Sequence, residues 1–157
     1  MSAGEQLRVG VGRDAFTCVH PVRVRWAEAD AHRVVFNPQY FVYFDVAYTE
    51  YMRSIDVPFP DGLAELGVDM LAVNATANFR ASARYDDEIA VGARVGRIGR
   101  TSVRFDFAIW READLLVDGS VTYVVVDVRT RAPVPVPARV LDHIVAYERV
   151  RPEGAPS

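Results

Sequence analysis

Apolar and polar residues alternate along several stretches of the chain. Val22, Val24 and Trp26 alternate with two arginines, which is the period of a half-buried β-strand. Four later stretches show the same period: residues 71–85, 89–95, 103–109 and 115–128. The pattern therefore predicts five strands, and the odd positions of residues 71–85 are expected to face the core.

Between the first two predicted strands, apolar residues recur at steps of three and four instead. They form a single stripe, which is typical of a helix packed on a core: Tyr40, Phe44, Ala47, Tyr51 and Ile55. Asn37 is a favourable N-cap and Pro38 suits the first helical position. We therefore predict a long helix that opens at Asn37-Pro38 and ends before Pro58.

The order of elements predicts an α+β fold, in which a curved antiparallel five-stranded sheet wraps around one long central helix. A sheet with one apolar face needs such a cover. We expect a single domain over residues 16–150, with a short helix from residue 138, a partly flexible N-terminal segment at residues 1–15 and a disordered tail at residues 151–157. Gly119 indicates a bulge or, with Asp118, a hairpin turn.

Composition narrows the class of function. The chain has 157 residues, half of them hydrophobic, which suffices for one core. Its net charge of −3 argues against a nucleic-acid-binding protein, and no apolar run is long enough for a membrane span. The N-terminus lacks a signal-peptide core, so we expect a cytoplasmic protein. Without clustered histidines and cysteines, neither a metal nor another cofactor is expected.

The most informative chemistry lies between the first strand and the long helix. Asp30 stands seven residues before the expected helix start at Asn37. A carboxylate and the positive end of a helix can act together on a polarisable carbonyl, which points to acyl chemistry. Asp30 could instead be an ordinary turn or capping residue. Serine-esterase and dinucleotide-binding motifs are absent from the sequence.

All 18 basic residues are arginines, and their distribution is uneven. Residues 89–105 contain no acid but hold Arg94, Arg97, Arg100 and Arg104. Such a run is a solvated face or a site for phosphate groups.

Several segments together resemble one known family. They are residues 24–26, Asp30, residues 34–36, the Asn37-Pro38-Gln39-Tyr40 opening and residues 78–79 and 85–87. The chain resembles the hotdog-fold thioesterases, specifically the 4-hydroxybenzoyl-CoA thioesterase family and related bacterial acyl-CoA thioesterases. The resemblance extends from about residue 22 to residue 137, and it implies a thioesterase that acts on acyl-CoA or acyl carrier protein thioesters.

The resemblance also implies roles for individual residues. Asp30 would be catalytic, as nucleophile or general base, and the backbone N–H of Asn37 would polarise the thioester carbonyl. His32 and Arg33 would belong to the substrate loop. The family's active sites lie at a dimer interface, so a homodimer or homotetramer is expected.

Three further features follow from the same resemblance. Tyr40 would contribute to the pocket wall. The turn at Arg100, with Arg97 nearby, would meet the phosphates of coenzyme A. The family usually has a glycine where this chain has His32-Arg33, and glycine often marks a backbone conformation that other residues avoid.

Two other functions stay open. A hotdog hydratase or dehydratase needs a histidine paired with an acid, and His32 is the only candidate close to Asp30 in sequence. A non-catalytic protein that binds acyl thioesters is the second alternative, because the His32-Arg33 loop departs from the family pattern.

Overall fold

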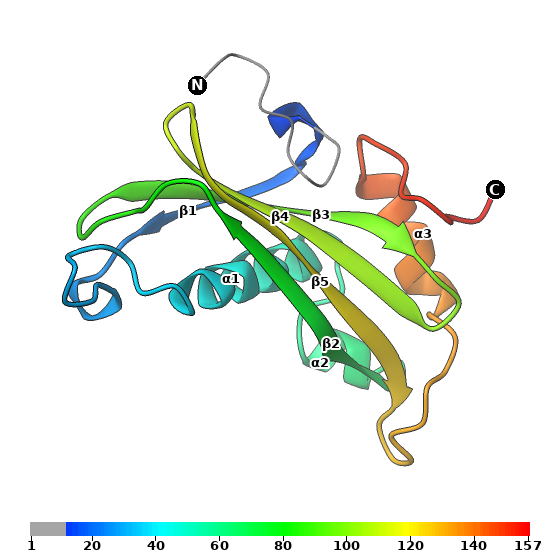
Figure 1. Cartoon of the computed structure of the whole chain (residues 1–157). Helices are drawn as coiled ribbons and strands as arrows, with labels where there is room; N and C mark the ends of the chain where they lie inside the picture. Colours follow the sequence, from blue (N-terminus) through cyan, green and yellow to red (C-terminus); the bar gives the residue numbers. More distant parts are fainter. Residues whose placement is uncertain (1–11) are drawn as a thin grey trace.

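An antiparallel sheet of five strands curves around one long helix in the computed structural model, which describes residues 12–157 (Figure 1). The strands are β1 (Cys18–Arg23), β2 (Val68–Phe79), β3 (Glu88–Ile98), β4 (Ser102–Arg111) and β5 (Asp114–Asp127). Their order in the sheet is β1-β3-β4-β5-β2, so β1 and β2 are the edges. The predicted α+β architecture is confirmed. The expected flexible segment at residues 1–15 lies mostly outside the described residues.

Helix α1 (Gln39–Ser54) fills the concave side of this sheet. All five residues of the predicted apolar stripe are buried. Phe44 stacks on Phe107 of β4, with ring centroids 4.7 Å apart, and Tyr48 stacks on Tyr123 of β5 at the same separation. These aromatic contacts fix the helix against the middle of the sheet.

Gly119 lies where β5 closely approaches β2 and α1. It forms neither the bulge nor the hairpin turn that the sequence suggested, because β5 runs through it and pairs with Phe107 and Ala77. A Cβ atom at this position would lie 2.1 Å from the Thr76 carbonyl oxygen and 3.0 Å from the Phe44 ring. Glycine is therefore required here by packing.

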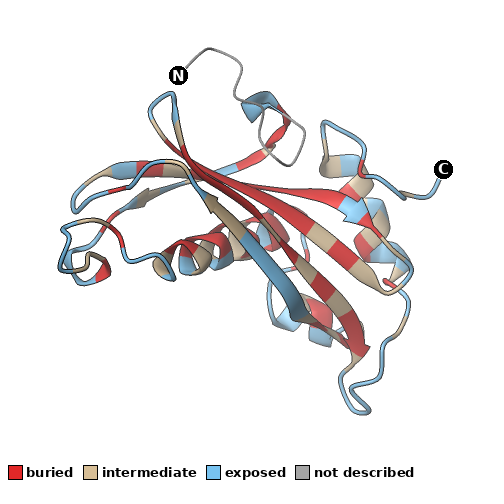
Figure 2. Cartoon of the chain, viewed as in Figure 1, coloured by how far each residue is buried: buried red, intermediate tan, exposed pale blue. Residues whose placement is uncertain are grey.

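Much of the apolar row of β2 is left uncovered. A register shift between Ala72 and Asn74 changes the side-chain alternation within this strand. The prediction that the odd positions of residues 71–85 face a core is wrong for Val73, Phe79 and Tyr85, which are 60%, 49% and 58% exposed, and the strand ends at Phe79. Figure 2 shows the middle of β2 exposed beside the buried strands β4 and β5. α1 contacts β2 through Tyr48 at Met70 and through Tyr40 at Phe79, while Val73 between these contacts stays exposed.

The N-terminal part of the described chain covers the opposite face of the sheet. Phe16, just after the short helix η1 (Arg13–Ala15), packs edge-on against Trp110 at 5.3 Å. The first predicted strand was placed too far along the chain. Trp26 begins the 3-10 turn η2 (Trp26–Glu28) and is 80% exposed.

The C-terminal segment returns to the sheet. Helix α3 (Ala138–Tyr147) buries Val140 and Ile144, and α2 (Asp61–Ala64) is a single turn. The expected disordered tail at residues 151–157 is a wrong prediction, because Glu153 accepts a hydrogen bond from Ile98 N–H and donates one to the Gly96 carbonyl. These bonds occupy the part of the β3 edge that β1 leaves open. No helix of residues 12–157 is long and apolar enough to cross a membrane.

We predict that Gly119→Ala lowers the free energy of unfolding by about 1–3 kcal/mol, because the added methyl group forces β2 and α1 apart. Urea unfolding followed by circular dichroism measures this change. Gly12→Ala is the matched control, since a Cβ atom there meets nothing within 4 Å. Equal stabilities of the two variants would contradict the packing assignment.

Candidate active site

The loop of residues 29–36 presents Asp30 on a tight turn. The Asp30 N–H donates to the Val34 carbonyl, and the Arg33 N–H donates back to the Asp30 carbonyl, both at 2.9 Å. Oδ1 of Asp30 accepts a hydrogen bond from the His32 N–H at 2.7 Å. An aspartate side chain that caps its own turn in this way is held in one orientation. The turn reading of Asp30 is thus correct, and it is compatible with a chemical role.

Arg33 adopts the backbone conformation that the family's glycine would favour. Its φ is +62°, in the left-handed region, which costs a residue with a side chain about 1–2 kcal/mol. The turn therefore forms with His32-Arg33 in place of a glycine, but the backbone of Arg33 is strained. The side chains of His32 and Arg33 are exposed beside Asp30.

The start of α1 differs from the prediction by one residue. The helix begins at Gln39, its N-cap is Pro38, and the side chain of Asn37 does not cap it. The Asn37 carbonyl is used instead, because it accepts the Tyr40 N–H. Asn37 therefore lies outside the helix, where its own N–H can point away from the helical bonds.

Most backbone N–H groups around the start of α1 are used within the chain, and the Asn37 N–H is the exception. The N–H groups of Val35, Phe36, Gln39, Tyr40 and Phe41 all donate to carbonyl oxygens, and Pro38 has no N–H. Within the described residues, the Asn37 N–H is the one amide of residues 35–41 for which no acceptor is found. An unused amide at the positive end of a helix is a ready donor to an anionic or carbonyl oxygen.

Asn37 lines a small pocket of about 120 Å³ between the start of α1 and the end of β2. The other lining residues are Tyr40, Phe79, Arg80, Ala81 and Ser82. Tyr40, which was expected in the pocket wall, lies here, and its hydroxyl already accepts the Ala83 N–H at 3.0 Å. Burial raises the pKa of Tyr40, and the charge of Asp30 adds a smaller upward contribution.

Arg80 closes one side of this pocket and is tied to the sheet. Its Nε lies 3.2 Å from Oδ1 of Asp118, a carboxylate that is fully buried. The pocket therefore has a fixed, polar wall opposite the aromatic ring of Tyr40.

Glu28 is the functional candidate that the sequence did not reveal. Its side chain is only 6% exposed and lies against α1. Tyr43 donates a hydrogen bond to it at 2.7 Å. The only sequence signal was the spacing of three from Arg25, whose N–H Glu28 also accepts.

Arg97 and Arg100 do not join Asp30 within one chain. They lie at the β3–β4 turn, at the opposite end of the domain from the Asp30 loop (Figure 1). Both are exposed, and Arg97 pairs loosely with Glu153 at 3.9 Å. A substrate bound at Asp30 of one chain cannot be assigned to the arginines of that same chain.

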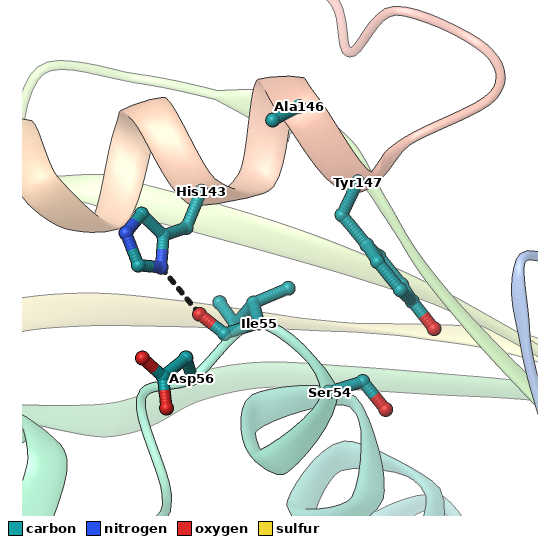
Figure 3. Close-up of a pocket in the computed structure, with 6 residues that line it drawn as sticks. All are labelled: Ser54, Ile55, Asp56, His143, Ala146 and Tyr147. Carbon is teal, nitrogen blue, oxygen red and sulfur yellow. Dashed lines mark hydrogen bonds between the residues drawn. The ribbon is translucent and has the colours of Figure 1, made fainter.

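A larger hollow of about 300 Å³ lies between the end of α1 and α3, and it lacks catalytic groups (Figure 3). Nδ1 of His143 is 2.5 Å from the Ile55 carbonyl and so carries the proton of that bond. Ser54 donates to the Glu50 carbonyl. Neither side chain is paired as a nucleophile with a base. Among residues 12–157, no group of three potential ligands is placed to hold a metal ion.

Comparison with known proteins gives a consistent result. Residues 32–117, more than half of the chain, match the thioesterase superfamily. This segment begins two residues after Asp30. Over 120 residues the chain is 27% identical to the acyl-CoA thioesterase YbgC of Haemophilus influenzae, which covers 76% of this chain and 88% of that protein.

Solved structures agree with this match. A protein of Pseudomonas aeruginosa is 25% identical, with a TM-score of 0.77 over 92% of this chain and 97% of its own. A 1,4-dihydroxy-2-naphthoyl-CoA thioesterase from Synechocystis shares the fold at 21% identity, with a TM-score of 0.73 over 80% of this chain and 93% of its own.

We predict that Arg33→Gly is at least as stable as the wild type, because glycine occupies φ of +62° without strain. Arg33→Val should lose about 1 kcal/mol or more, since a β-branched residue tolerates this conformation worst. Thermal unfolding of the two variants checks both values. A glycine variant less stable than the valine variant would show that the side chain of Arg33, and not its backbone, determines the turn.

Proposed function

The chain belongs to the thioesterase superfamily, and we propose that it hydrolyses the thioester bond of an acyl-CoA at the Asp30 loop. One observation carries the proposal. The Asn37 N–H is left without an acceptor at the start of α1, and the hairpin of residues 28–36 connects it to the turn that holds Asp30. A single amide donor and a single carboxylate are the minimum that hydrolysis of an activated acyl group requires.

The amide would bind the carbonyl oxygen of the thioester. Negative charge develops on that oxygen as the carbon becomes tetrahedral, and the amide together with the positive end of α1 stabilises it. The donor belongs to the backbone, so the identity of residue 37 matters little for this step. The rings of Tyr40 and Phe79, with centroids 5.6 Å apart, form the aromatic side of the pocket.

Asp30 would supply the second half of the chemistry by one of two routes. Its carboxylate can attack the carbonyl carbon, expel the coenzyme A thiolate and form a mixed anhydride, which water then cleaves to regenerate the carboxylate. It can instead accept a proton from a water molecule that attacks the carbon directly, after which the thiolate leaves. Either route yields a free acid and a free thiol.

The same geometry makes a hydratase a weaker proposal. That reaction needs the imidazole of His32 to work with Asp30, whereas the group of His32 that meets Asp30 is its backbone N–H. The acyl-CoA thioesterase name of the Haemophilus influenzae relative also favours hydrolysis. An acyl carrier protein thioester would present the same carbonyl and is the alternative substrate.

We further propose that a second copy of the chain completes the site. Within residues 12–157, β2 is an edge strand of twelve residues, and its own side chains Val73 and Phe79 are exposed. A long unpaired edge with apolar neighbours favours pairing with another strand. Pairing of β2 with the same strand of a partner would cover this row, and the partner could then bring Arg97 and Arg100 to the nucleotide end of the substrate.

Asp30→Asn should lower kcat by at least about 10²-fold while the melting temperature stays the same. Asparagine can still accept the His32 N–H, so the turn survives, but it can neither attack nor take a proton. Asp127→Asn is the control, because Asp127 caps a similar turn through the N–H groups of Arg129 and Thr130. Hydrolysis by a folded Asp30→Asn protein at the wild-type rate would refute the assignment.

Mixing two inactive or weakened variants tests the partner's contribution. The double variant Arg97→Ala/Arg100→Ala should raise KM for an acyl-CoA, because arginine binds phosphate through paired N–H donors, and should leave kcat unchanged. Mixed subunits of this variant and of Asp30→Asn should regain low-KM activity, since one site then combines an intact Asp30 with intact arginines. A mixture whose KM stays high would contradict this arrangement. Asp30 and the two arginines would then act within one chain, or the nucleotide of the substrate would bind away from these arginines.

A further inference from the structure

Glu28 is a buried carboxylate whose two oxygens both accept hydrogen bonds. Oε2 accepts the Arg25 N–H at 2.8 Å and the Tyr43 hydroxyl at 2.7 Å, and Oε1 accepts Nε of Arg25 at 2.8 Å. The Arg25 side chain is 78% exposed, so its ion pair with Glu28 contributes little. The bond to Tyr43 is the one formed away from water.

The backbone of Glu28 also connects the Asp30 segment with the segment that leads to Asn37. It stands two residues before Asp30, and its carbonyl accepts the Phe36 N–H at 3.0 Å. Phe36 directly precedes Asn37, whose amide is the proposed donor to the substrate. Glu28 therefore holds the segment that carries the Asp30 carboxylate against the segment that leads to the Asn37 amide.

Tyr43 fixes this junction to the helix. Its side chain is 1% exposed and lies one turn into α1, so it moves only with the helix. Burial opposes ionisation of Glu28, but the hydrogen bonds from Arg25 and Tyr43 outweigh it and hold the pKa of Glu28 below its usual range. The carboxylate is thus charged at neutral pH, which strengthens the bond from the Tyr43 hydroxyl.

We infer that Glu28, held by Tyr43, is a positioning residue that fixes the Asp30 carboxylate relative to the Asn37 amide. This inference rests on the proposed function of the Asp30 loop. Glu28 does not line the pocket, and its oxygens are already occupied, so it does not touch the substrate itself. Its effect is transmitted through residues 29–36.

The chain offers a matched control for this bond on the same helix. Tyr51 donates to Oε1 of Glu148 at 2.7 Å, and both side chains are buried. This second tyrosine–carboxylate pair lies two turns further along α1 and at the end away from Asp30. Tyr43→Phe and Tyr51→Phe therefore remove the same type of bond from the same element, and only the first bond reaches the site.

The experiment compares these two variants in the full chain. Both should melt at slightly lower temperatures. Tyr43→Phe should lower kcat by roughly 10- to 100-fold with little change in KM, because small misplacement of reacting groups has costs of this order. Tyr51→Phe should keep the wild-type kcat. Equal losses in both variants, no loss in either, or a change in KM alone would overturn the inference.

Two further measurements separate positioning from other roles. Glu28→Gln keeps an acceptor oxygen for Arg25 N–H and Tyr43, so its kcat and pH profile should stay close to wild type, whereas Glu28→Ala should match the loss in Tyr43→Phe. A large loss in Glu28→Gln would mean that the charge, and not the geometry, is used, which contradicts positioning.

Amide hydrogen exchange tests the positioning role of Glu28 and Tyr43 without an enzyme assay. Residues 29–36 should exchange faster in Tyr43→Phe than in Tyr51→Phe, and equal exchange would overturn the positioning role. If the wild type hydrolyses no thioester, the proposed function fails, but this comparison still shows whether Glu28 and Tyr43 hold the loop.

Discussion

Packing of the aromatic face of α1 into the curved sheet is the constraint on which the rest of the molecule depends. Phe44 and Tyr48 stack on rings of β4 and β5, and Gly119 allows the helix and β2 to approach the same strand. Each fully buried large side chain of this kind contributes about 1.5–3 kcal/mol. Because these contacts fix the helix, they also fix where its first turn lies, and therefore where its positive end and the pocket at Asn37 are found.

The site follows from how the backbone donors near that first turn are satisfied. Val35 donates to Ala83 and Phe36 donates to Glu28, so two segments distant in sequence hold the approach to the helix. The helix begins at Gln39, which leaves one amide at Asn37 unused. An unsatisfied donor is costly when buried and useful when it faces a pocket that a substrate can enter. One short hairpin thus carries a turn-held carboxylate at its tip and leads at its end to a free donor.

The sequence predicted the features that depend on local periodicity. The helical stripe from Tyr40 to Ile55 and the strands β3, β4 and β5 agree with their patterns, because burial on one side of an element imposes its period. The features that the sequence did not predict depend on contacts between residues that are distant in the chain. The exposed side chain of Val73 lies at the register shift of β2 between Ala72 and Asn74, and the burial of Glu28 depends on Tyr43, fifteen residues away. Asn37 has a suitable side chain for a cap, but hydrogen bonds upstream of it determine where the helix begins.

Thiol release by the wild-type protein tests the central claim most directly. A panel of acyl-CoA, acyl-pantetheine and acyl carrier protein thioesters is incubated with the enzyme, and the free thiol is trapped with a chromogenic reagent. Burial raises the pKa of the Cys18 thiol to about 11, so the protein itself contributes little background. We expect release of thiol and free acid in equal amounts from at least one acyl-CoA. Binding without release, or consumption of an enoyl thioester with the thioester bond intact, would contradict the account.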